Sequence, residues 1–245
     1  MKLFTLQFMC QLISFYGIYH YWNDFSLAWV LVIILGMQVF TLTLFECFMH
    51  RYCSHNSYKL NHYVESFLTY FSTLCTFGPA LTFAANHKKH HRNSDKEGDS
   101  HPASDGLKTY FWFNINKYHT TSRDILSVRR LMKKKHFNIQ SKHYFKIWFL
   151  LFTPFVLINP MFALCFILIP GVITFNVSGI VNVICHNLNL GYRNFDTNDN
   201  SVNINLLFIP GTLHNNHHNN PGSPSVKVKW HELDIGEYVI KAIRT

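Results

Sequence analysis

Long apolar runs alternate with polar, basic segments along the 245 residues of this chain. The first two runs extend from Leu3 to Trp22 and from Ser26 to Met49, with a short Asn23–Asp24 turn between them. As a helix, the second run is long enough to cross roughly 30 Å of hydrocarbon. Aromatic residues at the end of the first run suit a membrane interface. We therefore predict a hairpin of transmembrane helices at about 3–22 and 26–49.

A third apolar run, Ile147 to Cys185, lacks Asp, Glu, Lys, Arg and His over its 39 residues. This run is too long for one crossing and fits a second hairpin, with helices at about 147–166 and 167–185. Asn159–Pro160 is the favoured turn, because proline breaks helices and asparagine favours turns. Pro170–Gly171 is the alternative turn, or a kink within the last helix.

A weaker apolar run, Val64 to Ala85, is interrupted at Gly78–Pro79. A full crossing here would place the histidine motifs described below on opposite sides of the membrane. We therefore expect an interfacial or partly buried helix, after which the chain returns to the side of the membrane from which it entered. His62, just before this run, has no partner in any motif and is expected at the surface. Near the end of the chain, Trp230 to Ile243 fits a short amphipathic helix.

The composition supports a membrane protein, because 14 % of the residues are charged where soluble domains average about 25 %. The net charge is +9, and most basic residues lie between Lys88 and Lys146, beside apolar runs. This placement indicates a cytoplasmic surface at an anionic leaflet rather than nucleic-acid binding. The predicted fold is a single all-α integral membrane domain, 1–245, in which four transmembrane helices carry a helical cytosolic cap at about 50–146 and 186–245.

Histidines recur in one five-residue pattern, H-x-x-H-H, at His87–His91 and again at His214–His218. With 16 histidines in the chain, on the order of 0.07 copies of this pattern are expected by chance. Two copies therefore indicate function. In a helix, positions i, i+3 and i+4 share one face, so each copy can present three imidazoles to one point.

Two further groups resemble parts of the same set: His50 with His55, and Asn182 with His186. Five residues turn a straight helix through about 140°. The helix should therefore end or bend after His50, or His50 and His55 should serve different ions. The complete set suits two metal ions and comprises nine histidines: His50, His55, His87, His90, His91, His186, His214, His217 and His218.

Two membrane hairpins would bring all nine histidines to one surface, which is the arrangement that a shared site requires. Imidazole suits zinc, copper, iron and nickel. A structural zinc ion needs four ligands, commonly including cysteine. Two adjacent all-histidine sites instead favour a pair of irons that activate O2. Asn182 is a weak ligand, or holds a metal-bound water.

The order of these motifs resembles that of the membrane fatty acid desaturases of the stearoyl-CoA desaturase type. The similarity extends from about Glu46 to Ile243, and outside the histidine motifs it includes Ser94, Asp95, Asp99, His101, Gly191–Tyr192–Arg193 and Trp230 to Asp234. It implies four membrane helices under a cytosolic cap, with two iron ions held by the nine histidines and Asn182 supporting one ion through water. It also implies O2-dependent introduction of a cis double bond into a saturated acyl chain.

The resemblance further implies a long-chain acyl substrate on CoA or lipid, with delta-9 as the simplest double-bond position. Electrons would come from a separate donor of the cytochrome b5 or ferredoxin type. The active site would face the cytoplasm, in the inner membrane of a bacterium or the endoplasmic reticulum of a eukaryote. Asp99 and His101 either orient a ligand imidazole or are ordinary loop residues. Tyr192 and Arg193 either face the substrate or belong to a solvated loop.

Two other functions are consistent with these ligands. A fatty acid or alkane hydroxylase could use the same two-iron centre, because ligands alone do not decide between desaturation and hydroxylation. A non-enzymatic membrane protein that binds or transports metal is the second. It would require ionisable residues within the membrane crossings, and the run from Ile147 to Cys185 has none.

Overall fold

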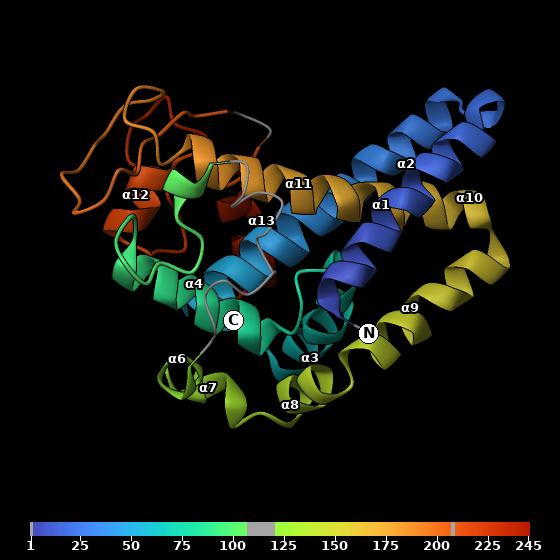
Figure 1. Cartoon of the computed structure of the whole chain (residues 1–245), viewed down its shortest axis with the longest axis horizontal. Helices are drawn as coiled ribbons and strands as arrows, with labels where there is room; N and C mark the ends of the chain where they lie inside the picture. The colour runs from blue at the N-terminus through green and yellow to red at the C-terminus, as the bar shows by residue number, and fades with distance from the viewer. Residues whose placement is uncertain (1, 107–120, 207–208) are drawn as a thin grey trace.

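The computed structural model describes residues 2–106, 121–206 and 209–245, and in these ranges the chain is all-helical (Figure 1). Outside the helices, the described residues pair only through isolated β-bridges, such as the one between Leu60 and Arg244. The predicted all-α class is confirmed. The part of the predicted cap at 107–120 lies outside the described residues.

The apolar runs form four helical stretches. The first two are joined by the short η1, Trp22–Asp24, and the last two meet at Asn159. Their bounds are α1 Leu3–His20; α2 Leu27–Met37 followed by the π-wound η2 Gln38–Ser54; α9 Tyr144–Ile158; and α10 Pro160–Ala163, the π-wound η5 Leu164–Leu168 and α11 Ile169–Ile184.

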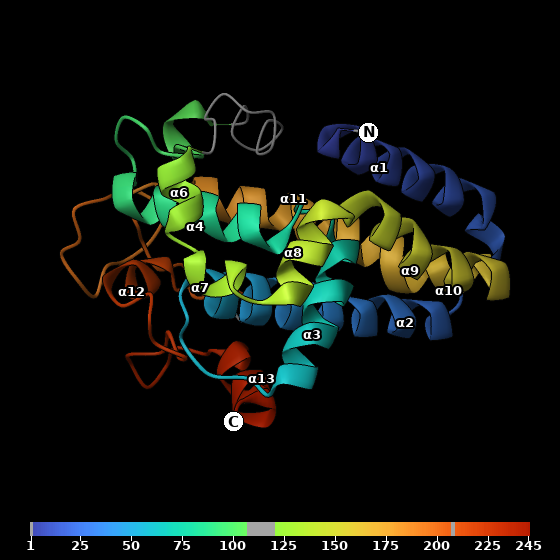
Figure 2. The ribbon, with the colours of Figure 1, turned by 90° about the horizontal axis from the view of Figure 1, so that it is seen from below.

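Shorter helices build the polar part of the molecule. Most of them lie around one end of the two long helices, which are α2 with η2 and α10 with η5 and α11 (Figures 1 and 2). Their bounds are α3 His62–Phe71, η3 Ser72–Cys75, α4 Ala80–Asn93, η4 Ala103–Asp105, α6 Ser122–Leu126, α7 Arg129–Met132, α8 Lys135–Lys142, α12 His214–Asn219 and α13 Ile235–Ile243.

Two continuous helices are long and apolar enough to cross a membrane, Leu27–Ser54 with 28 residues and Pro160–Ile184 with 25. The bent pair His62–Cys75 and Ala80–Asn93 would be a third if it formed one broken span. Helix α1 has 18 residues and α9 has 15. Length and composition therefore support a helical membrane protein, with two to three crossings among the described residues.

The turn of the second hairpin lies at Asn159, whose Oδ1 accepts a hydrogen bond from the backbone N–H of Phe162 at 3.1 Å. Pro160 then starts the next helix, where its missing N–H costs nothing. The division at 166/167 predicted from the sequence is thus wrong, and the turn falls at the Asn-Pro pair. Pro170 lies inside a continuous helix because the preceding π-wound turn, Leu164–Leu168, relieves the clash of its ring.

The weaker apolar run bends sharply between α3–η3 and α4, by 79°. The break includes Thr76 and Gly78, both with positive φ, at 60° and 88°. The bend lays α4 against η2. In this way the two helices that carry the first and second histidine motifs become neighbours.

Helix α2 approaches the π-wound part of the third stretch very closely at Gly36. A Cβ atom on Gly36 would lie 2.5 Å from Pro170 Cγ and 2.7 Å from the backbone oxygen of Phe166. Small residues permit such close approach between membrane helices. Gly171, in the same bundle, has room by contrast, because its nearest neighbour would be the Leu74 backbone oxygen at 3.5 Å.

We expect Gly36→Ala to destabilise the protein, because the added methyl group meets backbone that cannot move aside. Overpacking of this kind costs about 1–3 kcal/mol. The melting temperature of the purified protein should fall by several degrees in Gly36→Ala and stay unchanged in the control Gly171→Ala. Equal melting temperatures for the two variants would show that the helices are not in this close contact.

Candidate metal centre

The structure gathers the nine predicted histidines into two neighbouring groups. Within each group, one potential ligand atom per residue lies within 4.8 Å of every other. The first group is His50, His55, His87, His91 and His217, and the second is His90, His186, His214 and His218. The rings of His91 and His218, one from each group, have centroids 4.3 Å apart. The arrangement therefore provides two metal positions side by side.

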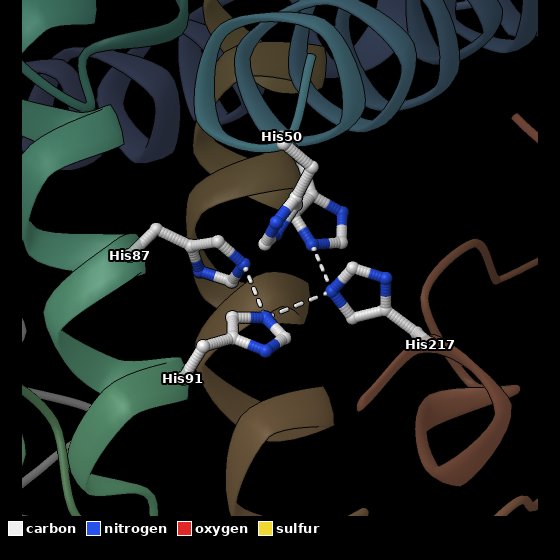
Figure 3. A group of neighbouring side chains, drawn as sticks. His50, His87, His91 and His217 are labelled. Atoms are coloured by element: carbon white, nitrogen blue, oxygen red, sulfur yellow. Dashed lines mark hydrogen bonds between the residues drawn. The ribbon is translucent and has the colours of Figure 1, made fainter. Parts of the chain in front are cut away.

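The five-histidine group joins three elements that lie far apart in the sequence (Figure 3). His217, from α12, places its Nε2 atom 2.9 Å from both His50 Nε2 and His91 Nε2. His91 Nε2 is in turn 3.0 Å from His87 Nε2. Two nitrogens that each bind one ion at about 2.1 Å and at right angles to one another are about 3.0 Å apart. These spacings fit imidazoles converging on one ion.

His50 and His55 belong to the same group because of the winding of η2. A π-helix bonds residue i to residue i+5, which places residues five apart on one face. The π-wound helix ends at Ser54, and His55 follows as its C-terminal cap. The ring centroids of the two histidines are 5.4 Å apart. The helix was expected to end or bend after His50, but it continues, π-wound, to Ser54. His50 and His55 fall in one group, so the expectation of separate groups is wrong.

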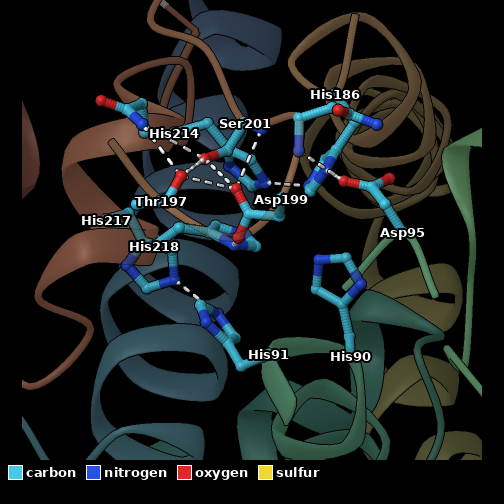
Figure 4. Close-up of polar contacts among 12 residues, drawn as sticks. His90, His91, Asp95, His186, Thr197, Asp199, Ser201, His214, His217 and His218 are labelled. Atoms are coloured by element: carbon cyan, nitrogen blue, oxygen red, sulfur yellow. Dashed lines mark hydrogen bonds and ion pairs between the residues drawn. The ribbon is translucent and has the colours of Figure 1, made fainter. Parts of the chain in front are cut away.

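The four-histidine group is built from α4, α12 and the residues that follow α11 (Figure 4). His186 Nε2 and His214 Nε2 lie 3.0 Å apart. The Nε2 atoms of His55, His90 and His218 are buried and, within the described part of the chain, have no hydrogen-bond partner. Buried polar atoms rarely stay unsatisfied without a bound ion or water. These nitrogens therefore fit a transition metal.

Acidic side chains contact the outward-facing nitrogens of four of these histidines. His50 Nδ1 lies 2.9 Å from Glu46 Oε2, and His90 Nδ1 lies 2.9 Å from Asp99 Oδ1. The corresponding partners of the other two are Asp95 for His186 and Asp199 for His218, both at 2.8 Å (Figure 4). Each carboxylate holds the Nδ1–H tautomer and leaves Nε2 for the metal.

His214 uses a backbone oxygen for the same purpose. Its Nδ1 lies 3.1 Å from the carbonyl oxygen of Gly211. Gly211 has φ of 84°, a conformation that glycine adopts without strain. The Pro210–Gly211–Thr212 turn thus orients the His214 ring.

Burial keeps the histidines of α12 neutral, as metal ligation requires. Removal from water, together with the neighbouring imidazoles, lowers the pKa of His214 and His217 well below the usual range. Burial also lowers the pKa of His218, although its hydrogen bond to Asp199 acts in the opposite direction. Neutral rings keep their inward lone pairs available.

Asn182 and His101 lie beside the two groups, at a small cavity of about 60 Å³. Asn182 Nδ2 donates a hydrogen bond to the His101 carbonyl oxygen at 3.0 Å. The ring centroids of His101 and His90 are 4.1 Å apart. The cavity is lined by the apolar side chains of Phe45, Phe83 and Val181 and by the imidazoles of His50, His87 and His214.

Asp99 contacts two further groups besides His90. It accepts hydrogen bonds from the backbone N–H groups of Asp95 and His101, each at 3.0 Å. Burial raises the pKa of Asp99 to about 6. Asp99 therefore links the loop after α4 to a ligand imidazole.

Tyr192 and Arg193 make contacts within the loops that support the histidines. Tyr192 donates a hydrogen bond to Glu232 Oε1 at 2.8 Å. Arg193 Nη2 donates to the carbonyl oxygen and the hydroxyl of Thr197, both at 2.8 Å. The Thr197 hydroxyl in turn donates to Asp199 Oδ1 at 2.8 Å. Contact of Tyr192 and Arg193 with a substrate stays a prediction.

Sequence reasoning did not assign a role to Glu46, Asp95 or Asp199. Glu46 precedes His50 by four residues, a spacing that places both on one helical face and could have revealed it. Asp95 Oδ2 is held by the backbone N–H of Asn200, 105 positions away. Asp199 has no comparable local signal, because His218 lies 19 positions further along the chain.

Comparisons with known proteins agree with this geometry. The fatty acid desaturase family model matches residues 24–243. The icosanoyl-CoA 5-desaturase of Limnanthes douglasii is 27 % identical over 260 residues, covering 98 % of this chain and 68 % of that protein. The delta-9 acyl-lipid desaturase 2 of Arabidopsis thaliana is 28 % identical, covering 78 % and 64 %. The sn-1 stearoyl-lipid 9-desaturase of Anabaena variabilis is 27 % identical, covering 87 % and 78 %.

We expect Asp199→Asn to weaken metal binding, because an amide no longer supplies the negative charge that fixes the His218 tautomer. Changes in such supporting groups typically lower metal affinity by about 10–100-fold. Metal retained by the purified protein against a competing chelator measures this effect. The control is Asp196→Asn, since Asp196 is fully exposed. Equal retention by both variants would contradict a supporting role for Asp199.

Proposed function

The chain belongs to the fatty acid desaturase family, and we propose that it is an O2-dependent acyl desaturase with two iron ions held by its nine histidines. The observation that carries the proposal is the convergence of nine imidazoles into two adjacent groups beside one cavity. The neutral rings and their carboxylate partners fit two transition-metal ions. When bound, the ions would supply activation of O2.

The proposed reaction converts R–CH2–CH2–R′, O2, two electrons and two protons into R–CH=CH–R′ and two molecules of water. The two hydrogens removed from the acyl chain leave with their electrons, and the donor supplies the other two electrons. That donor would be a separate protein of the cytochrome b5 or ferredoxin type. The product would be a cis double bond, with delta-9 as the simplest position.

The residues of this chain would position and shield the reaction. Glu46, Asp95, Asp99 and Asp199 hold ligand imidazoles in one tautomer. Asn182 fixes the cavity wall by its hydrogen bond to the His101 carbonyl oxygen, and its amide is the group proposed to orient water beside one ion. Apolar side chains of the cavity would exclude bulk water from the acyl chain.

The cavity between α4, α11 and the 209–214 segment is the proposed position of the reacting methylene groups. Phe45, Phe83 and Val181 supply its apolar lining, and His50, His87 and His214 also line it. The relatives are named for acyl-CoA and acyl-lipid substrates, with double bonds at positions 5 and 9. We propose a long acyl chain carried on CoA or lipid as the substrate.

For the membrane arrangement we propose four helices in two hairpins, with the histidine centre facing the cytoplasm. In the structure, α4 and α12 lie at the same end of the two long helices (Figure 1). This placement supports a centre at one membrane surface. Lys88, Lys89 and Arg92 of α4 fit the cytoplasmic side. The membrane would be the inner membrane of a bacterium or the endoplasmic reticulum of a eukaryote.

We expect a new unsaturated fatty acid in the membranes of a host that makes this protein together with an electron donor. Gas chromatography with mass spectrometry of the membrane lipids gives both the product and its double-bond position. His217→Ala should abolish the product, because His217 links two other ligands of its group. His20→Ala, which removes an exposed histidine from α1, should leave it unchanged.

Other outcomes of the same experiment discriminate between functions. A hydroxylated fatty acid would indicate the hydroxylase. Iron close to two atoms per chain, without any lipid product in the presence of both types of donor, would indicate a metal-binding protein. Absence of bound iron in the purified protein would reject the proposed centre.

We expect Val181→Phe to block acyl-chain binding while leaving the metal ions in place. Val181 is buried at the cavity wall beside Asn182, so a larger ring would occupy the proposed substrate position. Lipid product should be lost and iron content retained. The matched control, Val228→Phe, enlarges an exposed residue and should leave both unchanged. Full activity of Val181→Phe would place the substrate elsewhere.

A further inference from the structure

A third cluster of metal-ligating side chains lies outside the two histidine groups. It consists of His62, Glu65 and His136, each offering one potential ligand atom within 4.8 Å of the other two. His62 and Glu65 lie in the first turn of α3, and His136 lies in the first turn of α8. The two helices pack against each other (Figure 2).

His62 lies at the surface, as expected from the sequence. Its ring centroid nevertheless lies 5.5 Å from that of His136. The partner is 74 positions further along the chain and belongs to no repeated motif, so no local spacing could identify it. Packing of α3 on α8 creates the pair.

Glu65 is buried and uses its two carboxylate oxygens differently. Oε1 accepts hydrogen bonds from the Tyr52 hydroxyl and from Lys134 Nζ. No hydrogen bond from a described residue reaches Oε2, which lies 3.5 Å from His136 Nε2. One oxygen is thus fixed by the protein, and the other lies beside His136.

His136 is 6 % exposed, and its environment satisfies one ring nitrogen. Nδ1 lies 3.3 Å from the Ser66 hydroxyl oxygen. Nε2 is buried, and none of the described residues forms a hydrogen bond with it. If Nδ1 carries the proton, the Nε2 lone pair faces a carboxylate oxygen and the two repel each other. A cation between them would satisfy both atoms.

His136 is held neutral, so its Nε2 lone pair is available to a cation. Burial lowers the pKa of His136 despite the opposing effect of Glu65. Glu65, in the first turn of α3, supplies the negative charge that a bound cation needs.

We propose that His62, Glu65 and His136 form a third, mononuclear metal site that takes a zinc-like divalent cation. Two imidazoles and one carboxylate, with water in an open position, are a ligand set that zinc adopts in proteins. Calcium and magnesium prefer oxygen ligands. The bound ion pins α3 to α8. Through Glu65 and Tyr52 it also supports η2 between His50 and His55.

The proposal is independent of desaturase activity and is tested by zinc binding. Wild type and His62→Gln are purified in detergent and equilibrated with micromolar zinc in a chelator buffer, and bound metal is counted by mass spectrometry. Because His62 is exposed, this variant should fold normally, and its metal-free melting temperature verifies that it does. His143→Gln, at the cap after α8, is the matched control.

We expect wild type and His143→Gln to bind one zinc ion per chain more than His62→Gln. Zinc that occupies the nine-histidine centre is common to all three proteins and cancels in this comparison. Micromolar zinc should raise the melting temperature of wild type by several degrees more than that of His62→Gln, because binding to the folded state stabilises it. His136→Gln should lose the same single zinc ion.

Two results would overturn the proposal. Equal zinc content in wild type and His62→Gln would mean that the cluster is an ion-pair network alone. A difference that appears only at millimolar zinc would mean an adventitious ion only. Loss of lipid product in the earlier experiment would leave these zinc measurements unaffected, so the two proposals can fail separately.

Discussion

Every imidazole of the proposed metal centre has to turn one nitrogen inward, and hydrogen bonds to the opposite nitrogens favour that orientation. An imidazole whose Nδ1 is held by a carboxylate has one tautomer and one direction for its Nε2 lone pair. Glu46, Asp95, Asp99 and Asp199 provide this restraint from three segments: η2, the loop after α4 and the loop after α11. The loops after α4 and α11 therefore place acidic side chains at the outward-facing Nδ1 atoms of the histidines. The hydrogen bonds within these loops hold the acidic side chains in position.

A buried carboxylate needs a compensating positive charge, and Arg51 supplies it for Glu46. Arg51 is 1 % exposed and donates to Glu46 Oε1 at 2.9 Å. It also forms a bidentate pair with Asp234, at 2.7 and 2.9 Å. Loss of one member of a buried pair typically costs about 3–5 kcal/mol, because the other charge stays uncompensated. The pair therefore ties the C-terminal segment, where Asp234 caps α13, to the helix that supplies His50.

Helix geometry determines where the ligands meet. The π-wound η2 brings His50 and His55 into one group, which an α-helix of the same sequence would not do. The close approach at Gly36 sets the distance between the two long helices, and thereby the position of Asn182 relative to η2. The His62–Glu65–His136 cluster, in α3 and α8, lies beside η2, where Tyr52 donates a hydrogen bond to Glu65. The helix η2 therefore links the packing of the bundle to the positions of the histidines.

The sequence by itself determined the features that depend on short spacing. The apolar runs and the Asn159–Pro160 turn are local patterns that led to the correct elements. Each H-x-x-H-H motif marks the correct helix, but its three histidines divide between the two groups and do not converge on one point. Only the tertiary structure decided the contacts between distant segments. His218 meets Asp199, and His62 meets His136, because helices and loops pack together. Such pairs have no fixed separation along the chain, so hydrophobic periodicity and motif spacing cannot encode them, and the free energy of packing the whole fold selects them.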